Sequence, residues 1–204
     1  MNSAALLPAV TPASVVAAGP ADRGSVIEIL VAAFAHDPVV RWLYPDETSY
    51  LLSFPAIINA LGGRAFAHGG VFQTANRRAA ALWLPDGVSP DDAAIEAIVR
   101  RSLEGETRST AFAIFEQMGH AHPPGPHWYL PFIGVYPAFQ GSGLGSALLE
   151  ASLARCDAAG LPAYLESTHP RNVPLYRRYG FQVSGEIQAG DCPPLVPMIR
   201  PRRR

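Results

Sequence analysis

Three glycines at alternate positions, Gly141, Gly143 and Gly145, stand in the stretch GVYPAFQGSGLGSALLE (134–150). An apolar run precedes them and a run with helical spacing follows, which predicts a strand, a tight turn and a helix. Glycines allow the backbone N–H groups of such a turn to approach a ligand closely, and the start of a helix favours negative charge. The stretch therefore predicts a phosphate-binding turn, although a glycine-rich turn without a ligand has the same spacing.

Two common phosphate-binding turns do not fit these residues. A dinucleotide fold requires G-x-G-x-x-G directly after the strand, whereas the spacing here is G-x-G-x-G, with Ser146 next. An acidic residue, Glu166, does end the next expected strand, but too little chain follows for the remaining strand–helix units of such a sheet. The sequence contains no lysine, which excludes a Walker phosphate loop and a Schiff-base lysine enzyme.

Composition narrows the class of protein further. The 204 residues, about half of them apolar, are enough for a single domain over 1–204. A net charge of −1 gives no general attraction to nucleic acid. The only basic cluster is the C-terminal group Arg200, Arg202, Arg203 and Arg204, which we expect to be solvated.

Cysteine usage and the N-terminal stretch favour a cytoplasmic protein. Cys156 and Cys192 form neither a disulfide framework nor a metal-ligand cluster, so we expect a reduced compartment and no metal. The apolar residues 1–20 lack a basic leader region and are broken by Pro8 and Pro12. No run approaches the length of a membrane span, so no membrane partner is expected.

The elements that position the glycine turn follow from periodicity. We expect a short strand at 14–18, helices at 21–35 and 49–61 separated by a break at Pro38 and Pro45, and a hairpin over 71–75 and 78–84. Residues 85–126 are an expected helical insertion with one helix at 91–103, capped by Ser89 or Asp91, and a second ending near 120. The rest alternates: strand 127–135, helix 144–159, strand 163–167, a short helix from 172 and strand 181–187. A last strand, 195–200, is expected at the sheet edge because it contains Pro197.

Two ordered motifs carry a family resemblance. The run from Val135 to Gly145 resembles the Q/R-x-x-G-x-G/A signature of the GCN5-related N-acetyltransferase (GNAT) superfamily, and NVPLYRRYGF (172–181) resembles its second signature. The nearer likeness is to the puromycin N-acetyltransferase type, through HWYL, QGSGLGSAL and PRNVPLYRRYGF. It covers residues 127–185. Over the first 120 residues only the order of elements and the segment FAHDPVVRWLYP (34–45) agree.

This resemblance implies an α/β (α+β) fold. A mixed, mostly antiparallel sheet flanked by helices would splay its fourth and fifth strands around acetyl-CoA, with 127–185 as the acetyl-CoA-binding core and 85–126 as a helical insertion. The implied function is direct transfer of an acetyl group from acetyl-CoA to a primary amine of a small molecule. Acetyl-CoA is then the only cosubstrate and no metal takes part.

Site residues also follow from the resemblance. Val135 N–H would polarise the thioester carbonyl. Tyr176 would be the general acid, with Tyr179 as the second choice and a core tyrosine as the plain alternative. Glu166 would be the base, unless it pairs with an arginine and His127, His169 or a water chain serves instead. The implied acetyl-CoA contacts are Ile133, Val135, Gln140, Gly141, Gly143, Leu144, Gly145, Ser146 and Asn172.

The acceptor is the least constrained part of the prediction. Phe34, Asp37, Trp42 and Tyr44 either line an acceptor pocket or belong to the core. An aromatic, weakly charged lining would suit a small apolar amine such as an aminonucleoside. Two other functions stay open: a non-catalytic acetyl-CoA sensor, and an acetyltransferase acting on peptide or protein amines. The sequence also leaves open a homodimer.

Overall fold

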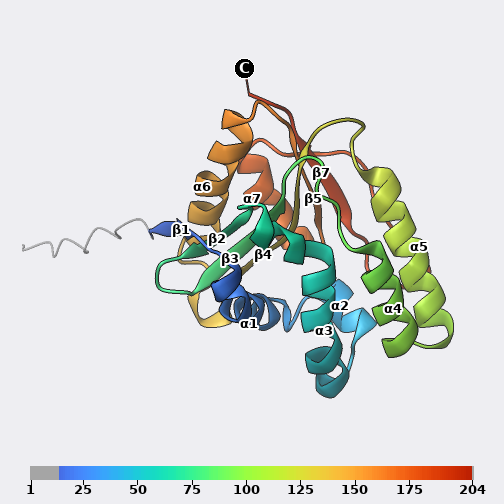
Figure 1. The fold of residues 1–204 in the computed structure, drawn as a ribbon. Coiled ribbons are helices and arrows are strands. Elements are labelled where there is room, and N and C mark those ends of the chain that lie inside the picture. The colour runs from blue at the N-terminus through green and yellow to red at the C-terminus, as the bar shows by residue number, and fades with distance from the viewer. Residues whose placement is uncertain (1–13, 204) are drawn as a thin grey trace, which may run out of the picture.

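The computed structural model describes residues 14–203, which form one twisted sheet covered by helices on both faces (Figure 1). The strand order is β1-β2-β3-β4-β5-β7-β6, and every neighbouring pair is antiparallel except the parallel pair β4 and β5. This mixed, mostly antiparallel sheet confirms the predicted fold class. The strands are β1 (Val15–Ala17), β2 (Val71–Thr74), β3 (Ala79–Leu84), β4 (Trp128–Val135), β5 (Ala163–Ser167), β6 (Gln182–Val183) and β7 (Val196–Arg200).

Three of the α-helices, α2, α3 and α4, begin at an aspartate whose side chain caps them. Asp46 accepts a hydrogen bond from Ser49 N–H at the start of α3, and Asp91 accepts one from Ala94 N–H at the start of α4. The α-helices are α1 (Arg23–Phe34), α2 (Pro38–Leu43), α3 (Glu47–Gly62), α4 (Asp92–Ser102), α5 (Gly105–Ala121), α6 (Leu144–Ala158) and α7 (Val173–Arg178).

The predicted break between the first two long helices is confirmed, because α1 ends at Phe34 and α3 begins at Glu47, but the short helix α2 that begins at Pro38 was not expected. Pro38 occupies the first helical position, where its missing N–H costs nothing, and Asp37 caps the helix by accepting hydrogen bonds from Val39 N–H and Val40 N–H. The proline therefore starts a short helix instead of interrupting a longer one.

Strand β3 separates two hydrophobic layers. Alternate β3 side chains, Leu82 among them, join a core with α1, α3, α4 and α5, while their neighbours, Trp83 among them, join a core with α6 and α7. All six β3 residues are buried. Helices α4 and α5 of the expected insertion share the first core, where Ile95, Ile98 and Val99 of α4 pack with the residues of α3.

Strand β4 carries an irregularity and then leaves its neighbour. Its register against β3 shifts between the pairs Leu82–Phe132 and Leu84–Tyr129, so one extra β4 residue is accommodated around Pro131, which has no N–H to donate. Strands β4 and β5 pair only at Trp128–Ala163 and Tyr129–Tyr164. Beyond those two pairs they diverge, which opens the sheet between them.

The last strand is not at the edge of the sheet as predicted. Strand β7 lies between β5 and β6, and the two-residue β6 forms the edge. The Pro197 carbonyl accepts a hydrogen bond from Ser184 N–H on the β6 side, after β6 has ended at Val183. Because Pro197 turns its backbone toward this short strand, its missing N–H costs no ladder bond.

The C-terminal arginines are not all solvated, contrary to expectation. Arg202 and Arg203 are exposed, but Arg200 is 2% exposed and forms a two-pronged ion pair with Asp157 of α6, with N–O distances of 2.7 and 2.8 Å. The predictions for residues 1–13 and Arg204 lie outside the described residues. Within 14–203, no helix is both long and apolar enough to cross a membrane.

Candidate active site

The glycine turn joins β4 to α6 with exposed backbone. Gly141 has φ 76° and Gly143, the residue that caps α6, has φ 86°. Side chains are disfavoured in this left-handed region, so the turn needs glycine at both positions. An added Cβ would meet nothing within 4 Å at either position, so the requirement is one of backbone conformation and not of space.

A cleft runs from this turn along the open side of β4 to α7. It is also lined by the basic side chains of Arg171 and Arg178. Left-handed glycines, a helix N-terminus and two guanidinium groups are chemically suited to the pyrophosphate of acetyl-CoA. All nine residues predicted to contact acetyl-CoA line this cleft: Ile133, Val135, Gln140, Gly141, Gly143, Leu144, Gly145, Ser146 and Asn172.

The backbone of Val135 faces the opening between β4 and β5. Tyr136 N–H donates to Arg78 O at 2.9 Å, so Tyr136 turns toward the β3 side of the sheet. Because successive strand residues alternate, Val135 must turn the other way. Its carbonyl indeed accepts from Gln140 Nε2 at 3.2 Å instead of pairing with β3. The Val135 N–H is thus directed into the cleft, where the predicted carbonyl contact requires it.

Tyr176 lies where this cleft meets a second pocket. It belongs to α7, is 6% exposed and lines both hollows. Burial raises the pKa of its phenol above the usual value, and the nearby Asp37 carboxylate adds to the increase. A phenol with a raised pKa stays protonated at neutral pH, as a proton donor must. Tyr179 lines neither hollow.

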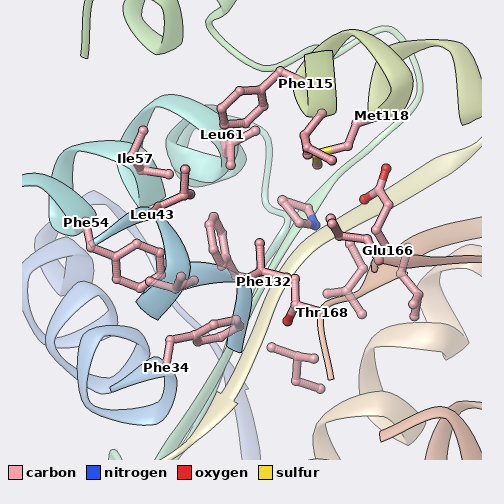
Figure 2. Close-up of a pocket in the computed structure, with 18 of the residues that line it drawn as sticks. Phe34, Leu43, Phe54, Ile57, Leu61, Phe115, Met118, Phe132, Glu166 and Thr168 are labelled. Carbon is pink, nitrogen blue, oxygen red and sulfur yellow. The ribbon is translucent and has the colours of Figure 1, made fainter. Parts of the chain in front are cut away.

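The second pocket is mostly apolar (Figure 2). Phe34, Phe54 and Phe132 lie on one side, and Phe115 and Met118 of α5 lie on another. It contains about 100 Å³ of space for small molecules or water, before any side chain moves. The insertion helix α5 therefore contributes directly to this pocket.

Among the residues that line this apolar pocket, Glu166 is the one with a carboxyl side chain. Its side chain is 3% exposed, and burial raises its pKa to about 7, although the neighbouring Tyr129 and Tyr164 phenols act in the opposite direction. Neither Glu166 Oε1 nor the Tyr164 hydroxyl has a hydrogen-bond partner within residues 14–203. No arginine pairs with Glu166 there, which removes the structural alternative considered for it.

The four residues proposed to line an acceptor pocket divide between two roles. Phe34 and Trp42 line the apolar pocket, and Phe34 and Asp37 line the cleft beside the glycine turn, where Asp37 accepts a short hydrogen bond from Thr168 Oγ1. Tyr44 is 1% exposed and its hydroxyl is hydrogen-bonded to Ser102 Oγ at 2.9 Å, so it belongs to the core.

The alternative bases are placed differently. His169 lines the cleft beside the glycine turn and accepts a hydrogen bond at Nδ1 from Arg171 N–H at 3.3 Å. His127 touches a residue that the sequence did not single out, His122, whose Nε2 lies 3.7 Å from Glu166 Oε1. No spacing signal could have found His122, because its partner lies on a distant strand. Across 14–203, His, Cys, Asp and Glu side chains form no group suited to a metal ion.

Comparisons with known proteins agree with this geometry. The acetyltransferase (GNAT) family model matches residues 97–181. An uncharacterised N-acetyltransferase of Schizosaccharomyces pombe is 30% identical over 196 residues, which cover 84% of this chain and 76% of that protein. A Corynebacterium glutamicum structure, described as histone acetyltransferase HPA2 and related acetyltransferase, is 28% identical with a TM-score of 0.66, over 94% of this chain and 97% of that one.

More distant structures share the fold. The polyamine N-acetyltransferase of Drosophila melanogaster has a TM-score of 0.64 at 14% identity, over 91% of this chain and 98% of that one. Both this likeness and the yeast relative extend over the N-terminal half, where the motifs alone were thin. The chain therefore belongs to the GNAT family of acetyltransferases and is an acetyl-CoA-dependent acyltransferase.

Proposed function

We propose that this protein transfers an acetyl group from acetyl-CoA directly to the primary amine of a small, largely apolar molecule. The observation that carries this proposal is that the apolar pocket meets the acetyl-CoA cleft at four residues, Phe34, Ile133, Asn172 and Tyr176. A substrate in the pocket would thus present its amine where the acetyl group of the bound thioester lies. The likeness to the puromycin N-acetyltransferase type remains a prediction within this proposal.

Glu166 would prepare the amine for attack. An alkyl amine is protonated at neutral pH, and it becomes a nucleophile only after losing that proton. A buried carboxyl with a pKa near 7 is ionised often enough to accept the proton and is not stabilised too strongly in its charged form. Because the pocket is apolar, a neutral amine also binds there more favourably than an ammonium ion.

Tyr176 and Val135 would act on the thioester end. Acetyl-CoA, when bound, supplies the activated acetyl group. Val135 N–H, directed into the cleft, would donate a hydrogen bond to the carbonyl oxygen as negative charge develops there. Tyr176 would give its phenolic proton to the departing sulfur, which suits its position between the two hollows. The second proton that the nitrogen loses as the amide forms would restore the phenol.

The proposal is tested by thiol release from acetyl-CoA with a panel of amines. The panel contains 2-phenylethylamine and puromycin as apolar primary amines, spermidine as a polyamine, and a peptide with a free amino terminus. We expect release with one or both apolar amines. Tyr176→Phe should lower kcat about tenfold or more, because the phenol proton is used only in the reaction. The matched variant is Tyr179→Phe. Tyr179 lies at the end of α7 and lines neither hollow, so this variant should retain the wild-type rate.

Other outcomes identify the alternatives. Binding of acetyl-CoA without release for any amine would favour the non-catalytic sensor. Release only with the peptide would replace the small-molecule substrate by a peptide. A loss of activity in Tyr179→Phe with full activity in Tyr176→Phe would transfer the role of acid to Tyr179.

A further inference from the structure

The base proposed above is cut off from solvent on the substrate side. Each acetylation of an ammonium ion releases one net proton, because the amide and the thiol together hold one proton fewer than the ammonium ion. If Glu166 accepts that proton, it must lose it again before the next cycle. Its side chain is 3% exposed and lines an apolar pocket, which holds a substrate during turnover. A route for the proton must therefore exist elsewhere.

His122 is the titratable group that approaches the unpartnered Glu166 oxygen. Its Nε2 lies 3.7 Å from Glu166 Oε1, so a shift of less than about 1 Å would bring the two atoms to hydrogen-bond length. The ring is held in place by aromatic neighbours, with centroid distances of 4.6 Å to Tyr129 and 4.5 Å to Tyr164. Packing therefore holds His122 Nε2 at this distance from Glu166 Oε1.

A hydrogen-bonded chain fixes which His122 nitrogen is free. Gly125 O, which can only accept, lies 2.8 Å from His127 Nδ1, so His127 Nδ1 carries the hydrogen. In the neutral ring His127 Nε2 is then an acceptor, and it lies 2.9 Å from His122 Nδ1. His122 Nδ1 must therefore be the donor. The lone pair of neutral His122 is left on Nε2, the atom that faces Glu166.

The other side of His122 opens to solvent. Its side chain is 25% exposed and lines a surface groove between α4 and α5. Glu96, Arg100 and Glu116 also line that groove. Tyr129 lines both this groove and the apolar pocket, so only a thin wall of side chains separates them. His122 thus lies between the buried carboxyl and water.

We propose that His122 is the proton outlet of Glu166, held in the required tautomer by His127. The carboxyl proton on Glu166 Oε1 passes to the lone pair on His122 Nε2, which leaves a carboxylate and an imidazolium. A tilt of the ring about its hydrogen bond to His127 then turns Nε2 toward the α4–α5 groove, where the imidazolium returns that proton to water. His122 Nδ1–H stays bonded to His127 throughout, so the ring ends in its starting tautomer. This inference rests on Glu166 acting as the base.

The electrostatic surroundings agree with a relay that does not store the proton. Burial and, to a smaller extent, the neighbouring His127 together lower the pKa of His122 to about 4. The imidazolium is therefore short-lived at neutral pH, and the lone pair is available again for the next proton. The remaining ionisable groups around Glu166 are Tyr129 and Tyr164, whose raised pKa values keep both phenols neutral.

The test compares His122→Ala with His120→Ala, a matched variant of an exposed histidine at the end of the same helix. Thiol release is followed with 2-phenylethylamine, or with puromycin if that is the better acceptor, at low buffer concentration and with added imidazole. We expect His122→Ala to lower kcat about tenfold or more with little change in the KM for acetyl-CoA. Imidazole, which can enter the groove and carry the proton, should restore most of the rate. His120→Ala should match wild type with and without imidazole.

Two further variants separate this inference from the proposed function. Glu166→Gln should be inactive and should not respond to imidazole. His127→Ala, which frees the tautomer of His122 without touching Glu166, should lower kcat by a smaller factor and should also respond to imidazole.

If His122→Ala keeps wild-type kcat, or loses activity that imidazole does not restore while still binding acetyl-CoA normally, the outlet is overturned and Glu166 stands as base. If Glu166→Gln is fully active, or wild type is inactive with every amine, the base and the outlet are overturned together.

Discussion

At the scale of single residues, the Glu166 carboxyl that is proposed as the base also lowers the stability of the folded protein when it ionises. Burial raises its pKa to about 7 from an ordinary value of 4.5. Between these two values the folded protein holds a proton on Glu166 that the unfolded chain has lost. The free energy of unfolding therefore falls as pH rises through this window, because the folded state must then carry a buried, poorly partnered charge.

Glu166→Gln should consequently stabilise the protein at pH 8 relative to wild type, and do so far less at pH 5. A difference of about 2.5 pKa units corresponds to roughly 3 kcal/mol. For a chain of this length, that amounts to a rise in Tm of about 10 °C. Thermal unfolding followed by circular dichroism at both pH values measures the effect.

The matched variant for this prediction is Glu116→Gln, which removes an exposed carboxylate from α5. Its Tm difference from wild type should be small and equal at pH 5 and pH 8. A Glu166→Gln protein that is no more stable at pH 8 than at pH 5, relative to wild type, would show that the Glu166 carboxyl is solvated in the folded state.

The sequence could nominate Tyr176, because it stands in a motif of fixed spacing, and Glu166, because it ends the strand that follows the glycine turn and its helix. It could not nominate His122, whose interest comes from contacts with Glu166 and with His127. It also could not decide between core and pocket for Trp42 and Tyr44. Both are aromatic residues of one short segment, and only packing separates the Trp42 ring in the pocket from the Tyr44 ring in the core.

At the scale of elements, the turn before α6 has a conformational requirement that can be tested apart from catalysis. Gly143 caps α6 with φ 86°. Gly143→Ala should cost about 1–2 kcal/mol in that conformation, or shift the turn to avoid the cost. Either result moves the N–H groups proposed to hold the pyrophosphate, so we expect the Kd for acetyl-CoA to rise about tenfold. Isothermal titration calorimetry measures this change without an acceptor amine.

Gly24→Ala provides the control for the glycine turn. Gly24 lies in the first part of α1, an added Cβ there meets nothing within 4 Å, and its backbone is helical. Alanine is favoured over glycine in such a position, so this variant should fold at least as well and bind acetyl-CoA with wild-type affinity. Equal affinities for Gly143→Ala and Gly24→Ala would remove the turn from the proposed binding site.

Elements were predicted best where the local pattern and the tertiary structure favour the same conformation. The hairpin of β2 and β3, the two insertion helices and the strand–turn–helix around α6 all have clear periods and clear ends. The errors concern proline. Pro38 and Pro197 were interpreted as breaking or excluding signals, but what a missing N–H costs depends on where that N–H would point. That direction is set by Asp37 and by the short β6, which a local pattern does not contain.

At the scale of the whole molecule, the divergence of β4 and β5 is what brings the two hollows together. One side of the opening receives the glycine turn and α7, and the other receives α1, α3 and the insertion helix α5. The divergence was expected only from the resemblance to the GNAT superfamily, because the order of elements alone does not determine where two paired strands separate. The shape of the apolar pocket depends on how α5 packs, and neither motif covers that helix.

The C-terminal end of this arrangement is held by Arg200, whose side chain is 3% exposed. It donates to both Asp157 carboxylate oxygens of α6 and, from Nε at 2.9 Å, to Tyr179 O after α7, so it joins β7 to both helices on that face.

Arg200→Ala should lower the free energy of unfolding by about 3 kcal/mol, the low end for a broken buried pair because Asp157 is partly exposed. The Arg200 hydrogen bonds lower the pKa of Asp157, so the difference from wild type should shrink as pH falls below about 4 and Asp157 is protonated. Urea unfolding at pH 7 and pH 3.5 measures both effects, with the exposed Arg202→Ala expected within about 0.5 kcal/mol of wild type. Equal stabilities for the two variants at pH 7 would mean that β7 is held by its strand pairing alone.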